Sequence, residues 1–149
     1  MKNQFLRNIL LIVIILILIG IATVVQGYWA LWDYKSSPSS SCLDCDIFTD
    51  LVISSLLPAF FIGIVNFLSF KFLWKKKIKV LGTAFVLFVS WFIIDTEIFI
   101  EREASWSTYT NVWEISFLLA AIPILTIGIL FIMLFNYVTG KISFARNRK

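Results

Sequence analysis

Four long runs of apolar residues, separated by short polar segments, dominate the pattern along the chain. The runs cover about residues 9–29, 47–73, 80–100 and 113–138. Each has roughly the 20 residues that an α-helix needs to cross the hydrocarbon core of a bilayer. The sequence therefore predicts an all-α, polytopic membrane protein, a compact bundle of four transmembrane helices that forms one transmembrane domain over residues 1–149.

Two of the runs contain residues that interrupt the apolar pattern. Pro58 lies inside the second run, where it is expected to kink or loosen the helix. The third run is uncharged only from Val80 to Ile94, which is short for a span. A helix that crosses about 30 Å at 1.5 Å per residue must continue to about Phe99. Asp95 is therefore expected just inside the membrane boundary.

Composition supports the bilayer as the main solvent. The 149 residues are 60% hydrophobic and 15% charged, whereas soluble domains are about half apolar and a quarter charged. Four spans leave no room for a second folded domain. A cleaved signal peptide is the competing interpretation of the first run, but Val25-Gln26-Gly27 is a poor cleavage site. The chain has no histidine, so no metal site is expected.

The basic residues divide unevenly between the segments that connect the runs. Lys35 and Arg102 are the only two of 13 that fall in the first and third loops, whereas all nine acids fall there or at that membrane edge. Short loops rich in Lys and Arg stay in the cytoplasm. We therefore expect both termini inside, loops 1 and 3 periplasmic or extracellular, and insertion in the cell inner membrane. The other eleven basic residues are Lys2, Arg7, Lys71, Lys75, Lys76, Lys77, Lys79, Lys141, Arg146, Arg148 and Lys149.

The net charge of +4 has a topological explanation in this division, so no nucleic-acid partner is expected. Tryptophans agree with the orientation, because Trp32, Trp91 and Trp106 are expected in an aromatic belt at the outer interface and Trp74 at the inner one. The first loop continues from this belt into residues 36–41, Ser-Ser-Pro-Ser-Ser-Ser, which are expected to form a polar, flexible turn.

The only two cysteines, Cys42 and Cys45, form a Cys-Leu-Asp-Cys motif before the second run. In an oxidising compartment the two would form a disulfide. If a helix begins near Ser41, its N-terminus would lower the pKa of Cys42, whereas Asp44 and Asp46 would raise it. A structural staple is the simpler interpretation, and a redox pair is the alternative.

The motif and the topology resemble the bacterial quinone-linked disulfide oxidases of the DsbB type. These are four-helix membrane proteins with cytoplasmic termini and a CxxC at the outer entrance of the second helix. The resemblance implies a thiol–disulfide activity at Cys42 and Cys45, with quinone as its cofactor. Members of that family also have a second cysteine pair and an arginine soon after the CxxC. Here the loop 101–112 has no cysteine and residues 46–50 have no arginine.

Four acidic residues form a second candidate site: Asp50, Asp95, Glu97 and Glu114 lie near the outer ends of three spans. Ionisable groups at membrane depth often serve function. The simpler interpretation is solvation or pairing, in particular of Asp95 with Arg102 seven residues later on one helix face. The alternative is a cation-attracting mouth or a docking patch for a partner.

A third candidate is a packing seam on the second run. Ser55, Ala59 and Gly63 recur at intervals of four, a pattern that lets another helix approach closely, within the monomer or between copies. Asn66, one turn further on, is expected to form a hydrogen bond across the bundle.

No complete catalytic or metal-binding set is evident in these residues. We therefore expect a small non-enzymatic protein that needs no cofactor and acts by binding another membrane or periplasmic protein, as an accessory, regulatory or toxin-immunity subunit. A homo-oligomer is also possible in the lipid bilayer. The alternative is a thiol-disulfide oxidoreductase, and the third is a cation channel or transporter subunit.

Overall fold

The computed structural model describes residues 2–71 and 76–146, and in these residues every regular element is helical. The elements are α1 (Lys2–Ala30), the 3-10 turn η1 (Trp32–Tyr34), α2 (Ile47–Ser54), α3 (Leu56–Lys71), α4 (Lys76–Arg102), the 3-10 turn η2 (Ala104–Trp106) and α5 (Val112–Arg146). The end of the second run at residue 73 and the basic residues Lys75, Arg148 and Lys149 lie outside the described residues, as does Trp74.

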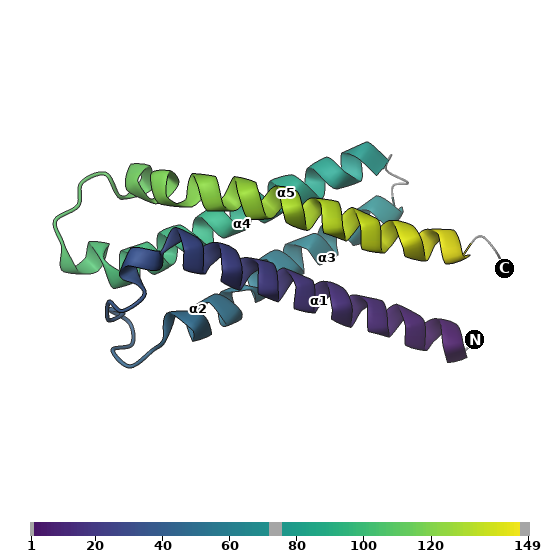
Figure 1. The fold of residues 1–149 in the computed structure, drawn as a ribbon, viewed down its shortest axis with the longest axis horizontal. Coiled ribbons are helices and arrows are strands. Elements are labelled where there is room, and N and C mark those ends of the chain that lie inside the picture. Colours follow the sequence, from purple (N-terminus) through teal and green to yellow (C-terminus); the bar gives the residue numbers. More distant parts are fainter. Residues whose placement is uncertain (1, 72–75, 147–149) are drawn as a thin grey trace.

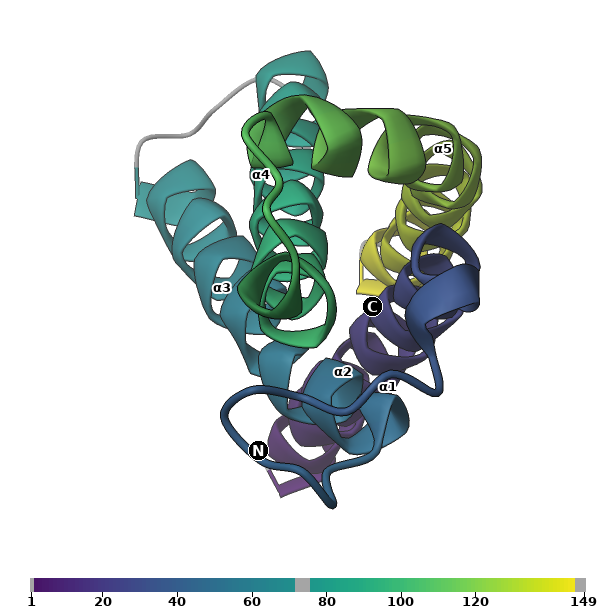
Figure 2. The same cartoon turned by 90° about the vertical axis from the view of Figure 1, so that its left-hand side faces the viewer.

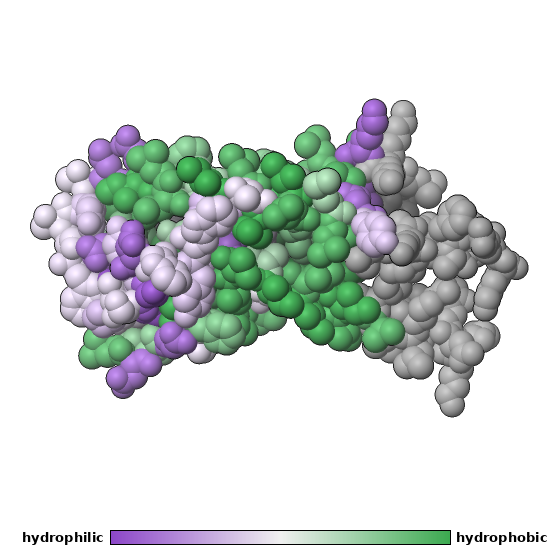
Figure 3. Space-filling model, viewed as in Figure 1, coloured by the Kyte–Doolittle hydropathy of each residue, from purple (hydrophilic) through white to green (hydrophobic). Residues whose placement is uncertain are grey.

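Within the described residues, four helical segments are long and apolar enough to cross a membrane: Ile12–Ala30, Ile47–Leu68, Lys77–Trp106 and Val112–Tyr137. The all-helical fold with four such helices is thus confirmed. Apolar side chains form a broad band over the middle of the molecule, and polar ones gather at one end (Figure 3). A surface of this kind suits a molecule surrounded by lipid.

The helices form a bundle in which α1 packs on α5 and α5 on α4, while α4 packs on α3 (Figures 1 and 2). The two loops 31–46 and 103–111 lie together at one end of the bundle, and we call them the cap. The start of α1 and the end of α5 lie at the opposite end (Figure 1). The C-terminal end of α1, the start of α2 and the C-terminal end of α4 therefore meet beneath the cap.

The second span is broken at Ser55, between α2 and α3, rather than at Pro58. Proline cannot donate a backbone hydrogen bond but is tolerated in the first turn of a helix, where the N–H has no helical partner. Pro58 occupies that first turn of α3, and the Ser55 hydroxyl donates to the Val52 carbonyl at 2.6 Å. The expected disturbance of the helix thus lies three residues before the proline.

Close packing in the bundle depends on two glycines that the sequence pattern did not single out. A Cβ at Gly27 of α1 would overlap the Leu51 side chain of α2, and one at Gly128 of α5 would overlap the ring of Phe88 on α4. Leu51 is fully buried. These glycines therefore set how closely α1 approaches α2 and α5 approaches α4.

Trp91 lies in the core and not in the outer aromatic belt, so its expected place was wrong. Its side chain is fully buried, and its Nε1 donates to Thr23 Oγ1 of α1 at 2.9 Å. The Thr23 hydroxyl in turn donates to the Ile19 carbonyl. A buried indole N–H needs such an acceptor, and the threonine provides it inside the bundle.

Candidate functional site

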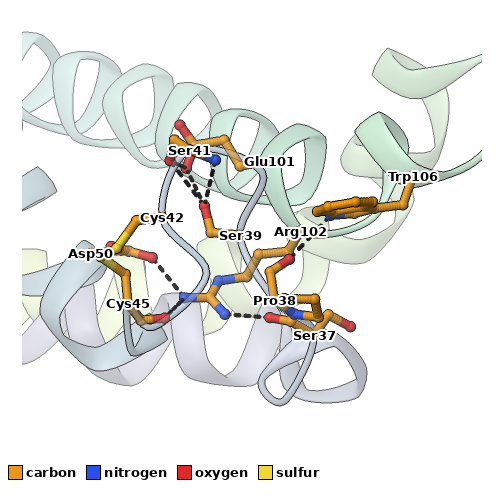
Figure 4. Close-up of polar contacts among 10 residues, drawn as sticks. All are labelled: Ser37, Pro38, Ser39, Ser41, Cys42, Cys45, Asp50, Glu101, Arg102 and Trp106. Carbon is orange, nitrogen blue, oxygen red and sulfur yellow. Dashed lines mark hydrogen bonds and ion pairs between the residues drawn. A yellow bond between two sulfur atoms is a disulfide. The ribbon is translucent and has the colours of Figure 1, made fainter.

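Arg102, the last residue of α4, organises the cap (Figure 4). Its side chain is only 3% exposed. Nη1 donates to the Ser37 carbonyl at 2.6 Å, and Nη2 donates to the Cys45 carbonyl at 2.9 Å and to Asp50 Oδ2 at 2.7 Å. A buried guanidinium must be paired, and these three acceptors provide both charge and hydrogen bonds.

The expected pairing of Asp95 with Arg102 is wrong, because Arg102 pairs with Asp50 and Asp95 accepts from Gln26. Seven residues of helix separate the two side chains by about 10 Å along the axis, too far for direct contact. The arginine extends towards the cap, beyond the end of α4, whereas Asp95 is buried against α1.

A second set of contacts fixes the serine-rich segment of the first loop. The hydroxyls of Ser39 and Ser41 donate to Glu101 Oε2 at 3.1 and 3.0 Å. The backbone N–H of Ser40 donates to the Glu101 carbonyl, and Trp106 Nε1 donates to the Pro38 carbonyl. The segment expected to be a flexible turn is therefore tied to the end of α4 and to the other loop of the cap.

An aromatic cluster lies under the same loops. Phe99 of α4 is fully buried, and the rings of Tyr34 and Tyr109 pack on it with centroids 5.2 and 5.8 Å away. Burial raises the pKa of the Tyr34 phenol, and the charges of Tyr109, Glu103 and Asp33 raise it further. Each loop of the cap thus contributes one tyrosine to a small shared core.

Cys42 and Cys45 form a disulfide with their Cα atoms 5.3 Å apart. The pair lies in the loop before α2, which begins at Ile47 and not near Ser41, so no helix N-terminus acts on Cys42. Both cysteines are half-buried, and Leu43 at the tip of their loop is 69% exposed. Arg102 holds this loop through the Cys45 carbonyl, which makes the disulfide part of the cap's fixed structure.

The four acidic residues do not form one cluster. Asp50 lies beside Arg102, and Asp95 is buried between α1 and α4. Glu97 is exposed and lines a groove with Asp50. Glu114, at the start of α5, accepts from Asn111 at 3.3 Å.

That groove has a volume of about 380 Å³ and runs between α4 and the broken second span. It carries the carboxylates of Asp50, Glu97 and Glu101, and Ser41 of the cap and several isoleucines also line it. Among the described residues, no three His, Cys, Asp or Glu side chains lie in a metal-binding group. The groove is an acidic surface beside the disulfide loop.

The seam residues do not share one packing partner. Ser55 faces Gly20 of α1, where a Cβ would stand 3.8 Å from its hydroxyl, and Ala59 packs against the core. Gly63 is exposed, and a Cβ there would meet no atom within 4 Å. Asn66 donates to the Ile62 carbonyl of its own helix rather than across the bundle. A contact at Gly63 between two copies stays a prediction.

Sequence reasoning missed Gln26 and gave Arg102 the wrong partner. Gln26 donates to Asp95 from an otherwise apolar run, and Arg102 anchors the cap. Two signals could have found these contacts: a single amide at the end of an apolar run, and one of only two basic residues on the acidic side.

Comparison of the chain with protein-family models, with curated proteins and with solved structures found no match.

Proposed function

We propose that the chain is a non-enzymatic, multi-pass protein of the inner membrane whose cap docks a basic segment of another protein. Eleven of the 13 basic residues lie in the two terminal segments or between the second and third apolar runs. This distribution supports a cytoplasmic position for both termini and a cap on the outer side. The observation that carries the proposal is the Arg102 anchor, which binds the first loop at two places, at the Ser37 carbonyl and at the Cys45 carbonyl of the disulfide. A mere connection between helices needs no such order.

The surface of the cap defines the chemistry of the partner. Asp33, Asp44 and Asp46 are exposed, and Lys35 is the one exposed basic residue described in the cap. Large apolar side chains stand among these acids: Trp32 is 57% exposed, Leu43 69% and Trp106 56%. Exposed tryptophans are frequent in protein interfaces, and the excess of acids favours a basic partner through charge complementarity.

Photo-crosslinking in cells tests this proposal. A photoreactive amino acid at Leu43 should give a discrete adduct with another protein. The matched control is Leu118 of α5, which is 68% exposed on an apolar helix and should give no such adduct. The triple change Asp33→Asn, Asp44→Asn and Asp46→Asn should abolish the adduct if charge attracts the partner.

Two outcomes would contradict the proposal. An adduct at Leu43 that is unchanged by removal of the three acids would show that charge does not select the partner. An adduct with lipid alone, or with a second copy of the chain, would assign the cap to the bilayer surface or to a homo-oligomer.

A thiol–disulfide oxidoreductase is the second candidate, favoured by the partial exposure of Cys42 and Cys45 at the cap surface. A partner thiolate would attack one sulfur, the other sulfur would leave as a thiolate, and the partner's second thiol would complete the transfer of two electrons. The reduced pair would then need an electron acceptor. The groove beside Ser41 carries three carboxylates among apolar side chains, and we derive no step through a quinone there.

The variant Cys45→Ser separates the two candidates. Under the docking proposal it gives no mixed disulfide on a non-reducing gel, and the Leu43 adduct persists. A specific mixed disulfide that disappears when Cys42 is also changed to serine would establish exchange at this pair instead.

A further inference from the structure

Asp95 is a buried acid in the part of α4 that spans the apolar band, and its side chain is 1% exposed. Oδ2 accepts a hydrogen bond from Gln26 Nε2 on α1. The Trp91–Thr23 hydrogen bond lies one helical turn away on the same two helices. Two polar contacts thus join α1 to α4 inside the bundle.

Each partner of this contact has a second buried atom without a hydrogen bond. These atoms are Asp95 Oδ1 and Gln26 Oε1. Both are acceptors when the carboxyl group is ionised, so neither can satisfy the other. An ionised carboxylate in this position would leave a buried charge with one hydrogen bond, which is costly in a low-dielectric interior.

No described cation compensates such a charge. At the capped half of the bundle, the titratable side chains described on α4 and on the elements packed against it are Tyr28, Asp50, Glu97, Glu101, Arg102, Glu103 and Glu114. Arg102 is the only base among them, and it is bonded to Asp50 and to two carbonyls of the cap. The five acids of this set carry the same sign of charge as an ionised Asp95 and therefore disfavour its ionisation.

We propose that Asp95 and Gln26 form a proton-binding site inside the bundle. A proton on Oδ1 makes that oxygen a donor, and Gln26 Oε1 is the unpartnered acceptor of the same side-chain pair. The acid and the amide then form two antiparallel hydrogen bonds, so one proton satisfies both buried atoms and removes the charge. Binding of the proton therefore adds a second hydrogen bond between α1 and α4 to the one that Gln26 Nε2 donates.

The proton site predicts a specific infrared signature for the full chain in detergent or lipid. At neutral pH the spectrum should contain the C=O stretching band of a protonated carboxylic acid. The band should be lost in Asp95→Asn and kept in Glu97→Gln, a matched control because Glu97 is an exposed acid two residues further along the same helix. The wild-type measurement needs no variant to fold.

Asp95→Asn is also a stable mimic of the protonated state, since its amide donates to Gln26 Oε1 while its oxygen accepts from Nε2. Folding of the wild type takes up a proton at this site, so its melting temperature should fall as the pH rises, whereas that of Asp95→Asn should depend less on pH. Absence of the acid band at neutral pH, or its survival in Asp95→Asn, would overturn the proposal. Loss of the band when sodium replaces a bulky organic cation would assign the site to a metal cation instead.

Discussion

Arg102 and Asp50 form an ion pair of 2.7 Å between the end of α4 and the first turn of α2. The arginine is 3% exposed and the aspartate 23%, so the pair lies partly shielded from water beneath the cap. Because the same guanidinium also binds carbonyls of Ser37 and Cys45, the pair connects two helices and the whole first loop. Loss of the arginine therefore affects more of the molecule than loss of the aspartate.

Arg102→Gln should destabilise the protein by about 3 kcal/mol, because a buried pair loses one partner and two loop carbonyls lose their donor. Asp50→Asn should cost less, since the guanidinium keeps both carbonyls and the carboxyl site is partly hydrated. Thermal unfolding in detergent measures both variants. Lys35→Gln is the control, an exposed base stacked on Trp32 at 3.2 Å, and should cost less than about 1 kcal/mol. Equal losses of stability for Arg102→Gln and Lys35→Gln would show that the contacts of Arg102 do not stabilise the protein.

The four helices were predictable from the sequence because each apolar run is long and few charges interrupt it. The Cys42–Cys45 disulfide was predictable because the motif is short and local. The contacts of Arg102 were not, since its acceptors lie 52 to 65 residues away and two of them are backbone carbonyls that leave no trace in side-chain patterns. The packing role of Gly27 was not predictable for a related reason, because it depends on the position of Leu51 on another helix.

Replacing Gly27 by alanine should destabilise the bundle by about 1–3 kcal/mol, because the new methyl group would overlap the buried side chain of Leu51. Gly63→Ala is the matched control. It introduces the same methyl group where no atom lies within 4 Å, and alanine favours the helix, so stability should stay the same or rise by up to about 1 kcal/mol. The melting temperature in detergent should therefore fall for Gly27→Ala and should not fall for Gly63→Ala.

A larger side chain at Gly63 tests the seam between copies. Gly63→Leu should leave the monomer folded, since the glycine is exposed. If two copies pack at this position, the variant should run at a smaller size in light scattering than the wild type. An unchanged size would assign Gly63 to the lipid-facing surface.

Alkaline pH should loosen the cap through Tyr34. Burial raises the pKa of this phenol in the folded protein, with Tyr109, Glu103 and Asp33 adding to the effect. A folded-state pKa above the unfolded value stabilises the protein below the unfolded pKa, and this stability is lost as the pH rises through the folded pKa. The tyrosinate absorbance of the wild type minus that of Tyr34→Phe should therefore titrate above pH 10, the ordinary value. A difference titration at or below pH 10 would contradict the burial of Tyr34.

Cysteine labelling in intact cells tests the orientation on which the function of the cap depends. In a background where Cys42 and Cys45 are serine, cysteines at Ser36 and Thr108, both exposed in the cap, should react with an impermeant maleimide. A cysteine at Lys77, exposed near the start of α4, should react only after lysis. The reason is the charge of the two ends, because short loops rich in lysine and arginine resist translocation.

Labelling of the cysteine at position 77 in intact cells would reverse the predicted orientation and place the cap in the cytoplasm. Thiols there are kept reduced, so the Cys42–Cys45 disulfide would not persist as a staple of the cap. The disulfide loop would then depend on Arg102 alone, and exchange with an outer-side partner would be impossible. This single result would therefore overturn both the docking surface and the oxidoreductase alternative, while leaving the Asp95–Gln26 proton site to be judged by its own infrared band.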